Sequence, residues 1–319
     1  MSKKNVFMFS GQGSQYYQMG KELYEHHKVF SYWMDACDEI ISPLLKTSFI
    51  DILYPKDKKG VAFDRLLHTN PALLSIQYCM FQVVKDMGIH PNYLMGYSLG
   101  EMAAAMVSEV ISLEDGLKFV VDMAEFLEEK TPQANMLALM AGKEIVLENP
   151  DYFAECWIIA TNFSGSFVVC GLPDDINSLQ KMLQEKGVTT QLLPVNQGFH
   201  TPIINNVENE FKQRIEKITL STPKIPIISS KKAAVVHEFT HDYFWDIIRY
   251  PVNFERTVKN TVENDDCIFI DLGPSGSLAT SVKYIVNSNS NVVPLQILNQ
   301  YGKNLNALEK FTTDYVAVQ

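Results

Sequence analysis

The sequence has few features of a membrane, secreted or nucleic-acid-binding protein. Among its 319 residues, no apolar run reaches the roughly 18 residues that span a bilayer. The apolar stretch from Val6 to Phe9 is too short for a signal peptide, so we expect a cytoplasmic protein. A formal net charge of −10 disfavours nonspecific binding to nucleic acid or to anionic membranes, because both need a basic surface.

Cysteine and arginine are also scarce. The five cysteines are scattered, and no CxxC or Cys/His ligand spacing occurs, which argues against a disulfide framework and against a zinc site. We therefore expect no metal. With 46% hydrophobic and 20% charged residues, the composition is that of a globular protein and not of a disordered one. Only four arginines are present, namely Arg65, Arg214, Arg249 and Arg256.

Short apolar runs alternate with segments of helical period, which indicates an α/β protein. We predict strands at 6–9, 93–95 and 267–272, and helices at 16–45 and 101–107. A further helix is expected to begin at Pro71, with the proline in its first turn. The chain is long enough for two average domains, or for one large domain that carries an insertion.

The middle of the chain predicts a small inserted domain. Strands are expected at 136–140, 157–160, 167–170 and 190–193, and helices at 150–154 and 174–186. This βαββαβ order is the ferredoxin-like pattern. The predicted architecture is an α/β-hydrolase-like large domain, residues 1–131 and 197–319, interrupted by a ferredoxin-like small domain, residues 132–196.

Gly96-Tyr97-Ser98-Leu99-Gly100 has the spacing of a nucleophile elbow, in which a serine sits on a tight strand-to-helix turn. A short apolar strand precedes the motif and an alanine-rich helix follows it. The serine would lie at a helix N-terminus, where backbone N–H groups favour a developing oxyanion. A tight structural turn without chemistry is the alternative.

His200 is the histidine best placed to serve as a base. It follows the strand that closes the insertion, and a loop there can face a cleft between the domains. Asp271 comes after this histidine in the chain, which argues against a serine–acid–histidine triad. Gly11-Gln12-Gly13 does not complete a dinucleotide fingerprint, because Tyr16 stands where a third glycine is needed.

Six motifs in order resemble the malonyl-CoA:acyl carrier protein transacylases and the acyltransferase domains of polyketide synthases. They are FSGQGSQ at 9–15, TNPAL at 69–73, GYSLGE at 96–101, GFHT at 198–201, YPVNF at 250–254 and DLGP at 271–274. The resemblance spans nearly the whole chain. It implies that Ser98 is the acylated nucleophile and that His200 is its general base and then its acid. The implied oxyanion hole consists of the backbone N–H groups of Gln12 and Leu99, and the carbonyl of Asn253 is expected to orient the histidine.

The acyl pocket implied by the resemblance departs from the family pattern. Malonyl-transferring members carry an arginine where this chain has Met123, and a buried carboxylate there would lack its partner. Neutral acyl chains gain instead from an apolar, adaptable thioether. Tyr97 replaces a histidine, Gln197 changes the residues before Phe199, and Asn162 matches a family asparagine near the pocket.

This pattern resembles the stand-alone acyl hydrolases of trans-acyltransferase polyketide synthases, which remove stalled acyl groups from carrier proteins. The sequence therefore predicts a serine-dependent hydrolase that proofreads by removing short neutral acyl groups through an acyl-serine intermediate. Three alternatives remain open: a transacylase for a neutral acyl unit, malonyl loading if Arg249 reaches the pocket, and a carrier-binding protein without catalysis.

The expected partners are acyl carrier proteins, with the acyl group on their phosphopantetheine arm and no other cofactor. We expect a monomer that binds neither nucleic acid nor membrane. Docking of an acidic carrier needs a local basic patch, for which Lys231-Lys232 and the loop at 56–59 are candidates.

Overall fold

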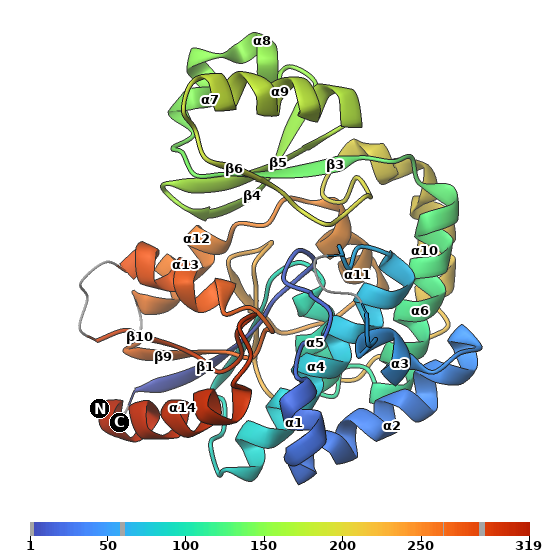
Figure 1. Cartoon of the computed structure of the whole chain (residues 1–319), viewed down its shortest axis with the longest axis vertical. Coiled ribbons are helices and arrows are strands. Elements are labelled where there is room, and N and C mark those ends of the chain that lie inside the picture. Colours follow the sequence, from blue (N-terminus) through green and yellow to red (C-terminus); the bar gives the residue numbers. More distant parts are fainter. Residues whose placement is uncertain (1–2, 58–60, 264, 287–290) are drawn as a thin grey trace.

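The computed structural model describes residues 3–57, 61–263, 265–286 and 291–319. Within them the chain forms two sheets, one in a large domain and one in a smaller domain that lies above it in Figure 1. The two chain ends lie side by side on the large domain, at the lower left of the same view. The α/β class with an inserted ferredoxin-like unit is thus confirmed.

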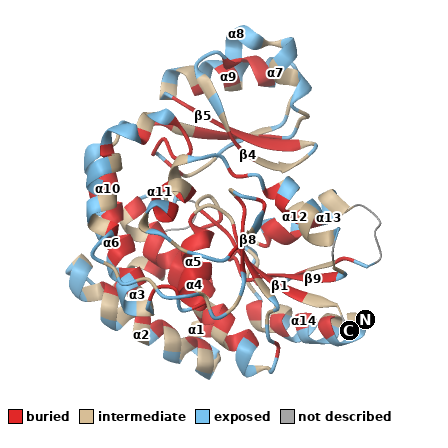
Figure 2. Ribbon diagram, turned by 180° about the vertical axis from the view of Figure 1, so that it is seen from behind, coloured by how far each residue is buried: buried red, intermediate tan, exposed pale blue. Residues whose placement is uncertain are grey.

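The large domain is built on a six-stranded sheet with strand order β10-β9-β1-β2-β7-β8. Its strands are β1 (Lys4–Phe9), β2 (Tyr93–Gly96), β7 (Ile227–Ser229), β8 (Ala234–Val236), β9 (Cys267–Asp271) and β10 (Val293–Gln296). All neighbouring pairs are parallel except β7 with β8. The central strands are continuous apolar runs because helices cover the sheet (Figure 2). Parallel strands bring their carboxyl ends to one edge, where ligand sites form.

Helices from both halves of the chain surround this sheet. They are α1 (Lys21–His26), α2 (Lys28–Leu45), α3 (Phe49–Leu53), α4 (Leu66–Asp86), α5 (Gly100–Val107), α6 (Leu113–Lys130), α10 (Glu208–Ile215), α11 (His241–Arg249), α12 (Phe254–Val262), α13 (Ser277–Val286) and α14 (Asn304–Val318), with a 3₁₀ helix at Pro202–Val207. Every residue of α5 is buried, so the helix that follows the serine motif lies inside the core (Figure 2).

The small domain follows the predicted βαββαβ order. It contains β3 (Asn135–Leu139), α7 (Glu144–Glu148), α8 (Pro150–Phe153), β4 (Cys156–Phe163), β5 (Ser166–Gly171), α9 (Pro173–Glu185) and β6 (Thr190–Leu192). The strand order is β4-β5-β3-β6, and the paired strands are antiparallel. One face of the sheet carries the helices, and the other faces the large domain (Figure 1).

Two predicted helices are wrong in their limits. The segment 16–45 is not one helix, because Gly20 and the extended His27 precede two separate helices, α1 and α2. Pro71 lies inside α4 and not in its first turn. The turn before the proline is held by a tertiary contact, in which the Leu67 N–H donates to Glu128 Oε1 at 2.9 Å. In the described part of the chain, no helix is long and apolar enough to cross a membrane.

Candidate active site

Ser98 lies in a tight turn between β2 and α5, at the carboxyl edge of the large sheet. Its φ of +52° is a left-handed conformation that costs a non-glycine residue energy and is kept where the surroundings enforce it. Both flanking glycines are required because neighbouring backbone lies too close to leave room for a side chain. A Cβ on Gly96 would lie 2.3 Å from the Glu101 Cα, and one on Gly100 would lie 1.9 Å from the Phe9 carbonyl oxygen. The turn therefore has the geometry of a nucleophile elbow.

His200 is brought to this turn by the fold, although 102 residues separate it from Ser98. Its Nε2 lies 2.7 Å from the Ser98 Oγ, and its Nδ1 lies 2.7 Å from the carbonyl oxygen of Tyr250. A carbonyl only accepts, so Nδ1 carries the proton and Nε2 is free to accept one from the serine. The pair is therefore arranged for removal of the serine proton by an uncharged imidazole.

The prediction that the Asn253 carbonyl orients the histidine is wrong. Asn253 caps α12, and its carbonyl accepts from the Thr257 N–H at 3.0 Å and from the Thr257 hydroxyl at 2.7 Å. The Tyr250 carbonyl instead follows the end of α11 and points to the imidazole. The position of this segment is fixed by pairing of Val252 with β4 of the small domain.

Burial controls the protonation of His200. The side chain is 6% exposed, and removal from water lowers the pKa of its imidazole from 6.5 to about 4. The hydrogen bond to Tyr250 opposes this change, and the positive charge of Arg249 adds to it. The imidazole is therefore neutral near pH 7, as a general base must be.

The loop that carries Gln12 packs directly against the serine turn. A Cβ on Gly11 would lie 2.6 Å from the Tyr97 carbonyl oxygen and 3.1 Å from the Ser98 Cβ. The Gln12 side chain is anchored by donation to Thr69 Oγ1 at 2.9 Å and to Asn70. Within the described residues, the N–H groups of Gln12 and Leu99 donate to no protein acceptor. Both N–H groups are thus available to a ligand oxygen beside Ser98.

An apolar cavity of about 40 Å³ opens on one side of Ser98, and we call it the acyl pocket. Its polar lining groups are Gln12, Asn70 and Ser98, and the remaining lining side chains are apolar ones from α5, α6, α10 and α11 together with Leu99 and Phe199. Met123 of α6 lines it and is 3% exposed. No cationic side chain among the described residues lines the acyl pocket. The cavity is therefore suited to an uncharged chain.

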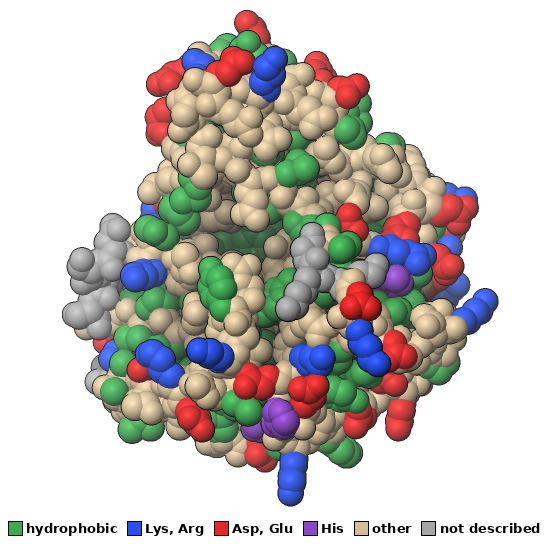
Figure 3. Space-filling model, viewed as in Figure 1, with side chains coloured by type: hydrophobic (Ala, Val, Ile, Leu, Met, Phe, Trp, Pro, Cys, Tyr) green, Lys and Arg blue, Asp and Glu red, His purple; other side chains and the backbone are tan. Residues whose placement is uncertain are grey.

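A second cavity of about 40 Å³ lies on the small-domain side of Ser98 and is lined by Tyr97, Phe199, His200 and side chains of β4 and β5. The space-filling view shows a hollow between the domains with hydrophobic side chains at its base (Figure 3).

Two residues predicted for the acyl pocket lie outside both cavities. The Asn162 side-chain oxygen accepts a hydrogen bond from the Tyr97 hydroxyl at 2.9 Å, and its amide nitrogen donates to the Ser166 hydroxyl at 3.3 Å. Its amide is therefore bonded to other side chains of the protein. Gln197 pairs through its backbone with Gln133 and lines neither cavity.

The arginines lie outside the acyl pocket, and three of the four have defined partners. Arg65 pairs with Glu128, and Arg214 pairs with Asp122 and Glu210. Arg249 donates to Asn205 and stacks over the Tyr250 ring at 5.3 Å. Arg256 is exposed on α12. The condition for malonyl loading through Arg249 is therefore not met in this conformation.

Glu101 is a supporting residue that sequence reasoning did not single out. It is 1% exposed, and its carboxylate accepts from the Ser230 N–H at 3.0 Å, the Ser230 hydroxyl at 2.8 Å and the Tyr243 hydroxyl. Burial raises its pKa, and these donors oppose the rise. Glu101 thereby links the serine helix α5 to α11, whose far end supplies the Tyr250 carbonyl. The charged residue within an apolar helix was the available signal.

Asp271 is also buried, but it serves the fold and not the serine. It accepts from the N–H groups of Gly273, Leu278 and Ala279 at 2.9–3.0 Å, which caps the start of α13. Burial raises the pKa of this carboxyl to about 6.

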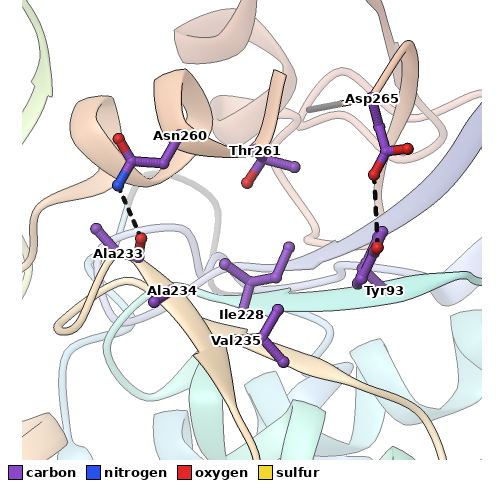
Figure 4. Close-up of a pocket in the computed structure, with 8 residues that line it drawn as sticks. All are labelled: Tyr93, Ile228, Ala233, Ala234, Val235, Asn260, Thr261 and Asp265. Carbon is purple, nitrogen blue, oxygen red and sulfur yellow. Dashed lines mark hydrogen bonds between the residues drawn. The ribbon is translucent and has the colours of Figure 1, made fainter. Parts of the chain in front are cut away.

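Another pocket, of about 260 Å³, lies at the amino end of β2, away from the serine turn. Figure 4 shows Asn260 and Thr261 of α12 above β8, and the Tyr93 hydroxyl donating to Asp265 at 3.4 Å. Among the described residues that line this pocket there is no serine, cysteine or histidine. Elsewhere in the described ranges, no group of three or more metal-ligating side chains is placed to hold a metal.

Comparisons with known proteins agree with this geometry. The acyl transferase domain family matches residues 6–318. The polyketide biosynthesis acyltransferase homolog PksD of Bacillus subtilis is 36% identical over 317 residues, covering 98% of each chain. The homolog BaeD of Bacillus velezensis is 35% identical over 291 residues, covering 91% of this chain and 90% of its own.

Solved structures show the same fold. A loading acyltransferase from the avermectin modular polyketide synthase superposes with a TM-score of 0.89 at 23% identity, over 98% of this chain and 99% of its own. The acyltransferase domain from the second module of the salinomycin polyketide synthase gives 0.84 at 26% identity, over 97% of this chain and 72% of its own. From the family match and from the identity to full-length relatives, we conclude that this chain belongs to the acyl transferase domain family.

Proposed function

We propose that this enzyme removes short neutral acyl groups from the phosphopantetheine thioesters of acyl carrier proteins in polyketide biosynthesis. The observation that carries the proposal is the apolar lining of the acyl pocket, which includes Met123; the resemblance places the arginine of malonyl-transferring members at this position. The neutral pocket favours an acetyl-like chain over a carboxylate, because a buried unpaired carboxylate costs several kcal/mol. Relatives named as polyketide biosynthesis acyltransferase homologs support the biosynthetic setting.

The first half-reaction forms an acyl-serine. The Ser98 Oγ attacks the thioester carbonyl carbon while His200 Nε2 takes the hydroxyl proton, and the N–H groups of Gln12 and Leu99 bind the resulting oxyanion. The tetrahedral intermediate then expels the thiolate as the carbon–sulfur bond breaks. His200 returns its proton to this sulfur, so that a free thiol leaves.

The second half-reaction releases the acid. Water attacks the acyl-serine carbonyl, His200 takes one proton from the water, and the ester bond to Ser98 breaks with return of that proton to the serine oxygen. The products are a short carboxylic acid and the free enzyme. A carrier thiol in place of water would give the alternative activity, a transacylase for a neutral acyl or malonyl unit.

A carrier protein loaded with acetyl, mixed with a second unloaded carrier of different mass, separates these activities. Hydrolysis predicts loss of acetyl from the first carrier, free acetate and no acetyl on the second. The Ser98→Ala variant should leave the acetyl in place. Acetyl accumulating on the second carrier without acetate would overturn the hydrolase assignment in favour of the transacylase.

Malonyl-CoA tests the role of the pocket directly. Wild-type protein is expected to load malonyl on Ser98 at least about 100-fold more slowly than acetyl, because an unpaired buried charge is costly. Met123→Arg should raise the malonyl rate relative to acetyl, while Met123→Leu, the matched apolar control, should not. Rapid malonyl loading by the wild-type protein would refute the neutral-chain assignment.

The Lys231-Lys232 pair, one candidate basic patch for docking of the carrier, has partners within this chain. Lys231 pairs with Asp246 and lies 4.5 Å from the Tyr250 ring centroid, and Lys232 lies over the Tyr243 ring. Because Lys231 is already paired with Asp246, less positive charge remains at this patch to attract an acidic carrier protein. In the other candidate loop, residues 58 and 59 lie outside the described residues.

A further inference from the structure

The acyl pocket includes an aromatic wall formed by Phe211 of α10 and Phe119 of α6. Phe211 is 2% exposed, and its ring meets Phe119 edge-on, with centroids 5.6 Å apart and an interplanar angle of 82°. Both side chains line the pocket. The flexible thioethers of Met102 and Met123 can change conformation to fit a ligand, whereas a tightly packed aromatic ring moves little when a ligand binds.

Trp245 lies behind Phe211. Their ring centroids are 5.4 Å apart, and Trp245 is buried but does not belong to the described lining of the acyl pocket. The Phe211 ring is therefore a partition between the pocket and the core around Trp245. Loss of this ring would extend the pocket toward the indole.

The volume of the pocket limits the chain that fits. About 40 Å³ of the pocket admits the centre of a water-sized sphere, and packed apolar side chains close around this space. With the carbonyl carbon held at Ser98, a short chain occupies this space, and each added methylene brings the chain closer to the side chains that close it, Phe211 among them.

We propose that Phe211 sets the upper length of the acyl chain that Ser98 accepts, with acetyl to butyryl admitted and hexanoyl and longer chains excluded. The inference rests on the proposed function only in that a neutral acyl group binds to Ser98. It is independent of whether water or a thiol then removes that group.

Acyl thioesters of N-acetylcysteamine, from acetyl to octanoyl, test this inference. The rate of thiol release and the mass of acyl-Ser98 are measured for the wild type, Phe211→Leu, Phe211→Ala and a control, Phe311→Ala. Phe311 is also 2% exposed, lies on α14 beside Tyr315 and lines neither cavity. Circular dichroism and thermal melting establish that each variant is folded.

The wild type is expected to react with hexanoyl at least about 10-fold more slowly than with butyryl, the scale of discrimination that apolar pockets achieve. Phe211→Ala should raise the hexanoyl-to-butyryl ratio by about 10-fold or more, Phe211→Leu by less, and Phe311→Ala not at all. An unchanged ratio in a folded Phe211 variant that still loads acetyl refutes the inference; if the alanine variant does not fold, the leucine variant decides. Failure of the wild type to form any neutral acyl-Ser98 would refute the proposed function instead.

Discussion

The pH dependence of acylation tests the environment of His200. Burial of the imidazole lowers its pKa to about 4, and only the unprotonated form can take the serine proton. The rate of acyl-Ser98 formation should therefore remain constant from neutral pH down to about pH 5 and fall to half near pH 4. A solvent-exposed histidine would lose half of this rate at pH 6.5.

The same displacement has a consequence for stability. Between pH 6.5 and 4 the imidazole takes up a proton in the unfolded chain but not in the folded one, so the free energy of unfolding falls as the pH falls. A change of pKa from 6.5 to about 4 corresponds to about 3 kcal/mol across this window. Above pH 6.5 both states are neutral, and this contribution is constant.

Rapid-quench mass spectrometry of acyl-Ser98 from pH 3.5 to 8 measures the kinetic midpoint, and urea unfolding measures the stability. His200→Gln is the control for stability, because buried carboxyls such as Asp271 titrate in both proteins and cancel in the difference. Arg249→Gln should move the kinetic midpoint upward, since the guanidinium helps to lower the histidine pKa. A midpoint at pH 6 or above in the wild type would refute a buried, desolvated imidazole.

Three further substitutions test how the serine turn is held. Gly100→Ala should destabilise the protein by at least about 3 kcal/mol in urea unfolding, because the new Cβ overlaps the Phe9 carbonyl oxygen; a loss below about 1 kcal/mol would contradict this packing. Glu101→Ala should lower the free energy of unfolding by about 2–4 kcal/mol, since it leaves buried donors unpaired, and an unchanged melting temperature would rule that network out. Tyr97→Phe removes the hydrogen bond to Asn162 and should cost about 1 kcal/mol in the same assay, whereas a more stable variant would argue against the bond.

Much of the fold could be predicted from local sequence patterns. The βαββαβ order of the small domain follows from short apolar strands and their spacing, which are properties of neighbouring residues. The nucleophile elbow was also readable, because tight approach of the backbone restricts Gly96 and Gly100 to glycine. The replacement of the family arginine by Met123 was likewise predicted from the sequence and the resemblance alone.

Two features that the sequence did not predict depend on contacts between segments far apart in the chain. The carbonyl that orients His200 belongs to Tyr250 and not to Asn253, because capping of α12 uses one carbonyl and pairing with β4 positions the other. The start of α4 before its proline likewise depends on Glu128.

The sequence by itself determined the βαββαβ order of the small domain, the strands that flank the site, and the serine and histidine motifs, since those depend on local periodicity and on short motifs. Only the tertiary structure decided that the two side chains meet at 2.7 Å, that Arg249 is held by Asn205, and that Phe211 closes part of the acyl pocket. The first two arrangements join side chains that are 102 and 44 residues apart in the chain, and their distances are set by how whole helices and sheets pack.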